Sequence, residues 1–183
     1  MHKYSVKHTG NERRFDEKSI IVSKTDLKGR LTYVNDVFCQ VGLYTTAELI
    51  GQPHSIVRHP DMPRCVFKLL WDTLQAGHEI FAYVKNMAKN GDHYWVLAHV
   101  TPTFGPAGRI TGYHSNRRTA RREAVAEIEP LYRTLLAEEA KHAGKREQVE
   151  ASTKVLHGVL AGLGVPYDEF VWSLEHKYAG AAR

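Results

Sequence analysis

The stretch EIFAYVKNMAKNGDHYWVLAHVTPTF, residues 79–104, decides the fold class. Two runs rich in aromatic and β-branched residues flank Asn90-Gly91, a dipeptide typical of a tight hairpin turn. In the second run, Tyr94, Val96 and Ala98 alternate with Trp95 and Leu97, so both faces of that strand are apolar. A strand of this kind is normally covered on both sides. We therefore expect the sheet to carry helices on one face and a helix from beyond Thr119 on the other.

The flanking sequence supplies the other elements of an antiparallel sheet. Upstream, two short β-branched runs at Ile20–Ser23 and Leu31–Val34 are joined by a turn-rich segment, which predicts a hairpin. Thr45 and Glu48 have the spacing of a capping box and predict a short helix. A longer helix follows, with an apolar stripe of Phe67, Leu70, Trp71 and Leu74. Downstream, RITGYHSNR predicts a last strand. The class is α+β, with a five-stranded antiparallel sheet, short helices on one face, and C-terminal helices.

The chain of 183 residues divides into three parts. Residues 1–18 are expected to form an N-terminal cap or a flexible segment, and residues 19–118 a single domain of ordinary size. Residues 119–183 favour amphipathic helices, which must pack on the domain, on each other or on a second chain. Pro130 either kinks the first of these helices or starts a second one.

Composition narrows the class of protein. Hydrophobic residues make up 43% and charged residues 25%, which is ordinary for a globular protein. No apolar run approaches the about 20 residues of a membrane span, and the N-terminus lacks an apolar signal core, so we expect a cytoplasmic protein. Cys39 and Cys65 are expected to be free thiols.

Charge and motif content argue against two further classes. The formal charge of +5 is concentrated in NRRTARRE, residues 116–123, but no aromatic residues interleave it for base stacking, so nucleic-acid binding is not expected. No GxSxG, HExxH or P-loop motif is present. We therefore expect neither an enzyme nor a metal centre.

The stretch IVRHPDMPRC, residues 56–65, is the strongest candidate for a binding site. Arg58 offers a planar fork of donors, His59 a donor near neutral pH, and Asp61 an acceptor. A structural alternative is that Asp61 caps the helix that follows and pairs with Arg58.

Several segments together resemble the PAS sensor domain of bacterial aerotaxis receptors. They are GQPHSIVRHPDMP (51–63), LWDTL (70–74), VKNMAKNGDHYWV (84–96) and EPLY (129–132), and the main likeness covers about residues 20 to 117. The resemblance implies a non-covalent FAD between the sheet and the short helices, with its redox state read out as a structural signal. It also implies that Arg58, His59 and Asp61 take part in FAD binding.

The resemblance adds four positions to the candidate site. Asn35 and Asn86 match polar positions that face the pocket in the family, although each could instead be a turn residue. Trp71 matches a family tryptophan but could be a core residue, and His54 lies in the first shared motif. Two positions depart from the family pattern. Ile80 replaces a tryptophan, which removes a stacking surface, and Leu43 replaces a glycine.

Two other functions stay open. One is a haem-binding PAS gas sensor, with an axial ligand among His54, His59, His78, His93, His99 and His114. The other is a cofactor-free dimerisation or adapter module that uses its terminal helices. In each case we expect the partner to be a signalling protein or a downstream receptor module, and homodimerisation stays open.

Overall fold

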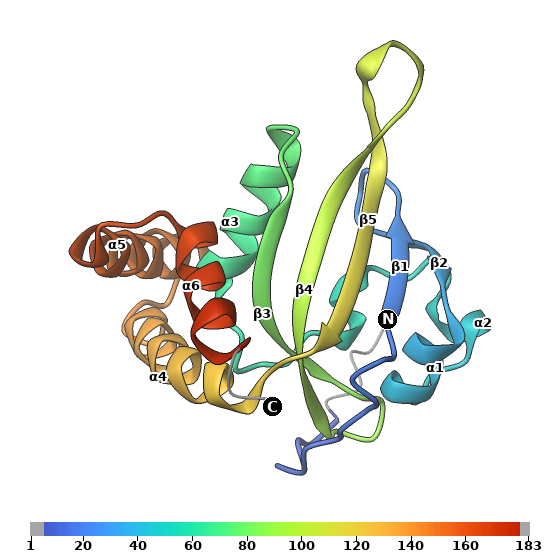
Figure 1. Cartoon of the computed structure of the whole chain (residues 1–183), viewed down its shortest axis with the longest axis horizontal. Coiled ribbons are helices and arrows are strands. Elements are labelled where there is room, and N and C mark those ends of the chain that lie inside the picture. The colour runs from blue at the N-terminus through green and yellow to red at the C-terminus, as the bar shows by residue number, and fades with distance from the viewer. Residues whose placement is uncertain (1–5, 180–183) are drawn as a thin grey trace.

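A computed structural model describes residues 6–179 and contains one five-stranded antiparallel sheet (Figure 1). The strands are β1 (Ile21–Thr25), β2 (Leu31–Val34), β3 (Ile80–Met87), β4 (His93–Phe104) and β5 (Ile110–Thr119). Their order in the sheet is β2-β1-β5-β4-β3, so β2 and β3 are the edge strands. The predicted fold class is confirmed, and both predicted hairpins are present.

Short helices connect β2 to β3 and pack on one face of the sheet. They are α1 (Asp36–Gly42), α2 (Thr46–Leu49), a 3-10 turn η1 (His54–Val57) and α3 (Arg64–Gln75). The predicted capping box starts α2, with Thr45 and Glu48 bonded reciprocally. A second 3-10 turn, η2 (Pro106–Gly108), lies at the tip of the long β4–β5 hairpin that projects from the body in Figure 1.

Three C-terminal helices lie beside the β3 edge (Figure 1): α4 (Arg122–Glu139), α5 (Lys145–Leu163) and α6 (Tyr167–Ala179). Pro130 lies inside α4 and does not end it. The Tyr132 ring stacks near Trp95 with centroids 6.2 Å apart, and its hydroxyl donates to the Tyr83 carbonyl at 2.7 Å. The second face of the sheet is therefore covered at β3 and β4 by helices from beyond Thr119, as the two apolar faces of β4 predicted.

The segment before β1 packs along the start of β4. The Arg13 amide donates to the His93 carbonyl at 2.7 Å, and the His93 amide donates to the Asn11 carbonyl at 2.9 Å. Residues 1–5 and 180–183, which belong to the predicted first and third parts, lie outside the described residues. Both cysteines are free. Within residues 6–179, no helix combines the length and apolarity that a bilayer crossing requires.

Candidate functional site: a cavity between the sheet and α3

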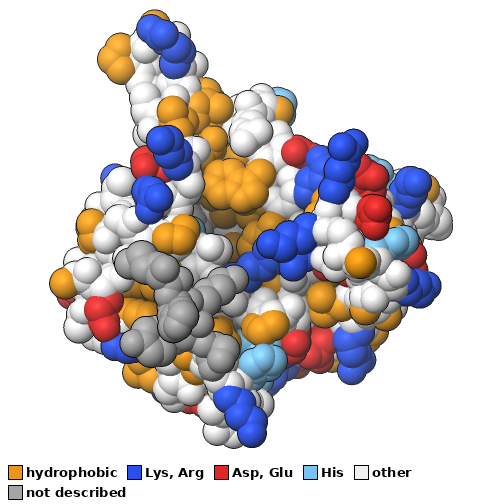
Figure 2. All heavy atoms as spheres, turned by 180° about the vertical axis from the view of Figure 1, so that it is seen from behind, with side chains coloured by type: hydrophobic (Ala, Val, Ile, Leu, Met, Phe, Trp, Pro, Cys, Tyr) orange, Lys and Arg blue, Asp and Glu red, His pale blue; other side chains and the backbone are white. Residues whose placement is uncertain are grey.

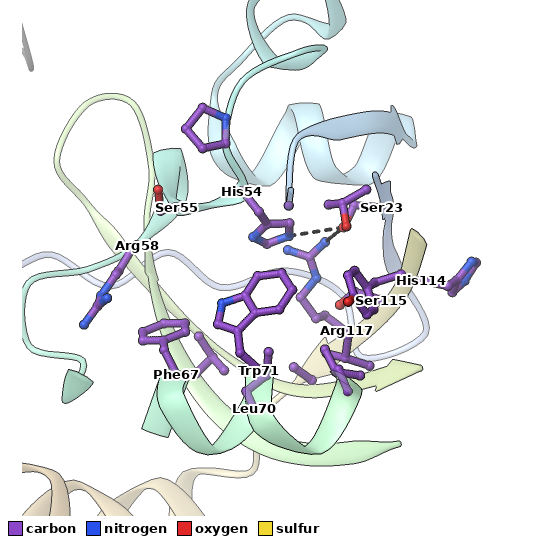
Figure 3. Close-up of a pocket in the computed structure, with 18 of the residues that line it drawn as sticks. Ser23, His54, Ser55, Arg58, Phe67, Leu70, Trp71, His114, Ser115 and Arg117 are labelled. Atoms are coloured by element: carbon purple, nitrogen blue, oxygen red, sulfur yellow. Dashed lines mark hydrogen bonds between the residues drawn. The ribbon is translucent and has the colours of Figure 1, made fainter. Parts of the chain in front are cut away.

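A cavity of about 340 Å³ lies between the sheet and the helices on its first face (Figure 3). The predicted apolar stripe of α3 forms one wall, and inward residues of β3, β4 and β5 form the other. The residues that line the cavity include Ser23, His54, Arg58, Phe67, Trp71, Asn86, Tyr113 and Arg117. The volume falls in the range of small-molecule sites, about 300 to 1,000 Å³.

Arg117 is the most unusual residue of the cavity. It is 2% exposed and reaches the cavity from β5. One guanidinium nitrogen, Nη2, donates to the Ser23 hydroxyl, while Nε and Nη1 have no hydrogen-bond partner within the described part of the chain. Burial lowers the pKa of Arg117 to about 10, so the group still carries its charge at neutral pH. The cavity thus contains a buried cation with two donor nitrogens that have no partner in the described structure.

Two more polar side chains in the cavity also have unused hydrogen-bonding groups. Asn86 of β3 is 3% exposed, and its Nδ2 has no partner among residues 6–179; the same holds for Oγ1 of Thr25. Buried donors without partners are rare in folded proteins, and each costs free energy until it is paired. These groups are available to a ligand with acceptor atoms or to water.

His54 lies at the same end of the cavity as Arg117 (Figure 3). Its Nε2 is 3.2 Å from the Ser23 hydroxyl, which also receives the hydrogen bond from Arg117. Burial first, and the positive charge of Arg117 second, lower the pKa of His54 to about 3. His54 is therefore neutral at physiological pH, and Arg117 supplies the positive charge at this end.

Aromatic side chains give the cavity flat walls. Trp71 and Tyr113 meet edge to face with centroids 5.2 Å apart. Gly29 has a φ of +72°, and a Cβ there would lie 3.1 Å from Trp71, so glycine lets the turn approach the indole closely. At the other end, the Arg58 guanidinium lies 4.2 Å from the centroid of Phe67. These walls suit a planar ring system.

Four of the seven predicted site residues line the cavity: His54, Arg58, Trp71 and Asn86. Arg58 follows η1, and its Nη2 donates to the Met62 carbonyl at 3.0 Å. Burial lowers the pKa of Arg58. These four residues come from η1 and the residue after it, from α3 and from β3, so the fold brings together positions that are far apart in the sequence.

The other three predicted residues lie outside the cavity lining. The Asn35 carboxamide is used structurally: it accepts from the Val22 amide at 2.9 Å and the Phe38 amide at 3.1 Å, and donates to the Ile20 carbonyl at 2.8 Å. His59 is 3% exposed, and its Nδ1 accepts from the Asp61 amide at 3.1 Å. The Asp61 carboxylate pairs with Lys85 at 2.8 Å.

The structural alternative for the RHPD stretch is also not what the fold shows. Asp61 pairs with Lys85 rather than with Arg58. The first amides of α3 are bound instead by the Glu139 carboxylate of α4, which accepts from Arg64 at 2.6 Å. A contact across 75 positions cannot be read from local sequence.

Arg117 was not among the predicted site residues, although the sequence contains a signal for it. Tyr113, Ser115 and Arg117 alternate along the predicted last strand, and the first of them is a large aromatic residue. If Tyr113 points inward, Arg117 must also point inward. A charged residue at an inward position of a central strand is a strong indication of a site.

The two positions that depart from the family pattern lie outside the cavity lining. Ile80 is a buried residue of β3, and Leu43 ends α1 with a φ of 59°.

Comparison with known proteins agrees with this architecture. Residues 31–117 match the family model described as the PAS fold. Among solved structures, a PAS domain from Colwellia psychrerythraea has a TM-score of 0.52 at 18% identity, covering 55% of this chain and 86% of that one. The light-state Aureochrome1 LOV structure has a TM-score of 0.53 at 17% identity, covering 64% and 91%. At such identities these likenesses bear on the fold alone. Together with the sheet order, they define this part of the chain as a PAS domain.

Two curated proteins share sequence similarity with this chain. The aerotaxis receptor of Escherichia coli (strain K12) is 48% identical over 121 residues, which are 66% of this chain and 24% of the receptor. The nitrogen fixation regulatory protein of Klebsiella pneumoniae is 28% identical over 103 residues, 56% of this chain and 21% of that protein. The PAS domain of this chain is therefore similar in sequence to a region of the aerotaxis receptor. The chain spans less than a quarter of the length of these relatives.

Proposed function

We propose that this PAS domain binds FAD non-covalently in the cavity and that the chain reports the redox state of the flavin to a signalling partner or a downstream receptor module. The observation that carries the proposal is the set of unused donors of Arg117 and Asn86 in an otherwise largely apolar, aromatic-walled cavity. On this proposal the chain is a cytoplasmic sensor and not an enzyme.

The residues of the cavity fit a flavin. One edge of an isoalloxazine ring carries carbonyl and ring-nitrogen acceptors, which complement the donors of Arg117 and Asn86. Trp71, Tyr113 and Phe67 supply aromatic surface for the ring. When bound, the flavin supplies electron transfer that changes the charge and hydrogen bonding of its ring. The buried cation of Arg117 favours any state of the ring that carries negative charge.

The mouth of the cavity suits the rest of the cofactor. Figure 2 shows apolar side chains gathered in the hollow of this face, with Lys and Arg side chains beside it. Lys28 and Arg58 are cations of the lining. Cationic side chains bind phosphate through charge-assisted hydrogen bonds, so they suit the pyrophosphate of a dinucleotide. The resemblance to aerotaxis receptors supports the same cofactor class.

An absorption spectrum of the purified protein tests the proposal. We expect the two broad near-ultraviolet and blue bands of an oxidised flavin, which bleach on chemical reduction. An intense Soret band would establish the haem alternative, in which His54 is the candidate ligand because its side chain points into the cavity whereas Figure 3 shows His114 turned away. A colourless protein that takes up no FAD from solution would support the adapter alternative.

A further inference from the structure

The residues from Arg58 to Met62 run along the outer edge of β3. Arg58 forms an isolated antiparallel bridge with Asn86, and the Lys85 amide donates to the Met62 sulfur at 3.2 Å. Because β3 is the last strand of the sheet, this segment covers part of an edge that would otherwise expose unpaired amides. The segment is therefore fixed to β3 at two successive residues.

The segment from Arg58 to Met62 crosses the edge of β3, so its two ends lie on opposite faces of the sheet. Arg58 lines the cavity on the first face, as does Asn86 of β3. Successive side chains of a strand point to opposite faces, so Lys85 points to the second face. There its Nζ meets the Asp61 carboxylate at 2.8 Å. Asp61 thus lies across the sheet from the cavity.

The Asp61 carboxylate compensates the charge of the buried Lys85 ammonium. The residue is 8% exposed, and its Nζ also lies 5.9 Å from the centroid of the Trp95 ring. Partial burial raises the pKa of Asp61, but the hydrogen bond and charge of Lys85 outweigh that effect and lower it overall. A buried cation that loses its partner is costly, because its desolvation is then uncompensated.

The ion pair also faces the C-terminal helices. A hollow of about 280 Å³ on the second face is lined by Asp61, Lys85 and Trp95 together with residues of α4, namely Glu129, Tyr132, Arg133 and Leu136. A displacement of Lys85 would therefore change the surface against which this part of α4 lies, while Asn86, the next residue of β3, faces the cavity.

We propose that Asp61 and Lys85 are positioning residues. From the second face of the sheet they hold Arg58 and Asn86 in place at the cavity, and a change at the cavity is transmitted to α4 through the Asp61–Lys85 pair. This inference rests on the proposed function for its ligand, but the ion pair itself can be tested without one. It predicts that Asp61 supports cofactor binding without touching the cofactor.

A double-mutant cycle separates this indirect role from direct contact. In Asp61→Ala the buried Lys85 is left unpaired, and we expect the dissociation constant for FAD, titrated into ligand-free protein, to rise by about tenfold or more. Adding Lys85→Met removes the orphaned charge and should return the constant to within about threefold of wild type. Arg58→Ala is the matched control, and Lys85→Met should not rescue it. If Lys85→Met fails to rescue a folded Asp61→Ala, or if Asp61→Ala binds like wild type, the proposal is overturned.

Hydrogen exchange over residues 129–136 tests the connection to α4. In ligand-free protein, Asp61→Ala should speed exchange there, whether or not FAD is the ligand, and unchanged exchange would overturn the proposal. With FAD bound, reduction should alter protection of these residues in wild type but not in the Asp61→Ala/Lys85→Met variant, although that variant retains flavin. A redox response that persists in the double variant would also overturn it.

Failure of wild type to bind FAD would instead count against the proposed function, and the ligand-free measurement would still decide on the ion pair. Should Asp61→Ala not fold, Asp61→Asn replaces it in both experiments.

Discussion

Arg117 in β5 donates a hydrogen bond to the hydroxyl of Ser23 in the neighbouring strand β1, and within residues 6–179 this is the one hydrogen bond that its guanidinium makes. The guanidinium carbon also lies 4.8 Å from the centroid of the Phe38 ring, which offers a cation–π contact but no counter-charge. The fold therefore holds a buried cation that a ligand would complete.

Replacing Arg117 should separate stability from binding. Arg117→Met removes a buried charge with unused donors, and we expect the free energy of unfolding of the ligand-free protein to rise by about 1 to 3 kcal/mol. The same change should weaken FAD binding by about ten- to a hundredfold, because one charge-assisted contact is lost. Urea unfolding and FAD titration measure the two effects. Arg118→Met, at the exposed neighbour, is the control and should change neither. A destabilised Arg117→Met that keeps full affinity would refute this account of the cavity.

Stability should fall on mild acidification because of His54. Its pKa is about 3 in the folded protein and near 6.5 in the unfolded chain, so the unfolded chain binds the proton first. This contribution to stability is complete above about pH 6.5 and is lost progressively toward pH 3. From about pH 7.5 to about pH 5 we expect His54 to account for a loss of about 2 kcal/mol. His54→Gln should flatten the pH profile of urea unfolding, and His157→Gln, at an exposed site, should not. Equal profiles for wild type and His54→Gln would contradict the assignment.

The sheet could be predicted from sequence because its signals are local. Asn90-Gly91 fixes the β3–β4 hairpin, and the apolar residues on both faces of β4 required a second helical layer. The way in which that layer is attached could not be predicted. Glu139 binds the first turn of α3, and no local pattern pairs an acidic residue with a helix that starts 75 positions earlier.

Glu139 should be important for the attachment of the C-terminal helices. Its Oε1 accepts from the amides of Arg64 at 2.6 Å and Cys65 at 3.4 Å and from the Ser152 hydroxyl at 2.9 Å. Glu139→Ala leaves the amides of Arg64 and Cys65 unpaired, and we expect a loss of about 1 to 3 kcal/mol and faster hydrogen exchange at the start of α3. Glu138→Ala removes a surface pair with Lys141 and should cost less than about 1 kcal/mol. Equal effects of the two changes would argue against this role.

The family difference at position 43 has a physical explanation that predicts the relative stability of two variants. Leu43 ends α1 in the left-handed region, with φ 59° and ψ 35°, where glycine carries no steric cost. The residue is 38% exposed, so removing its side chain also loses burial, and Leu43→Ala loses nearly the same burial as Leu43→Gly. Leu43→Gly should therefore be more stable than Leu43→Ala by about 1 kcal/mol. At Leu27, an exposed leucine without a positive φ, the glycine variant should be no more stable than the alanine variant. A Leu43→Gly variant that is no more stable than Leu43→Ala would show that the backbone of residue 43 carries no strain.

The candidate site was predictable in part, for reasons that particular residues make clear. Arg58 and Asn86 were identified as site residues, and both line the cavity. The RHPD stretch looked like one binding unit because its residues are adjacent, yet the chain crosses the edge of β3 between Arg58 and Asp61. Arg117 was not predicted because it lies in a cluster of arginines. Its inward orientation becomes evident only when Tyr113, Ser115 and Arg117 are recognised as residues on the same face of the strand.

The central claim is that the cavity binds FAD, and the mass of the released ligand tests it most directly. Protein purified after expression with ample riboflavin is denatured, and the supernatant is analysed by mass spectrometry. The account predicts FAD at close to one molecule per chain, and strongly reduced amounts from Arg117→Met purified in parallel. Release of haem, of another ligand, or of nothing from folded wild-type protein would contradict it.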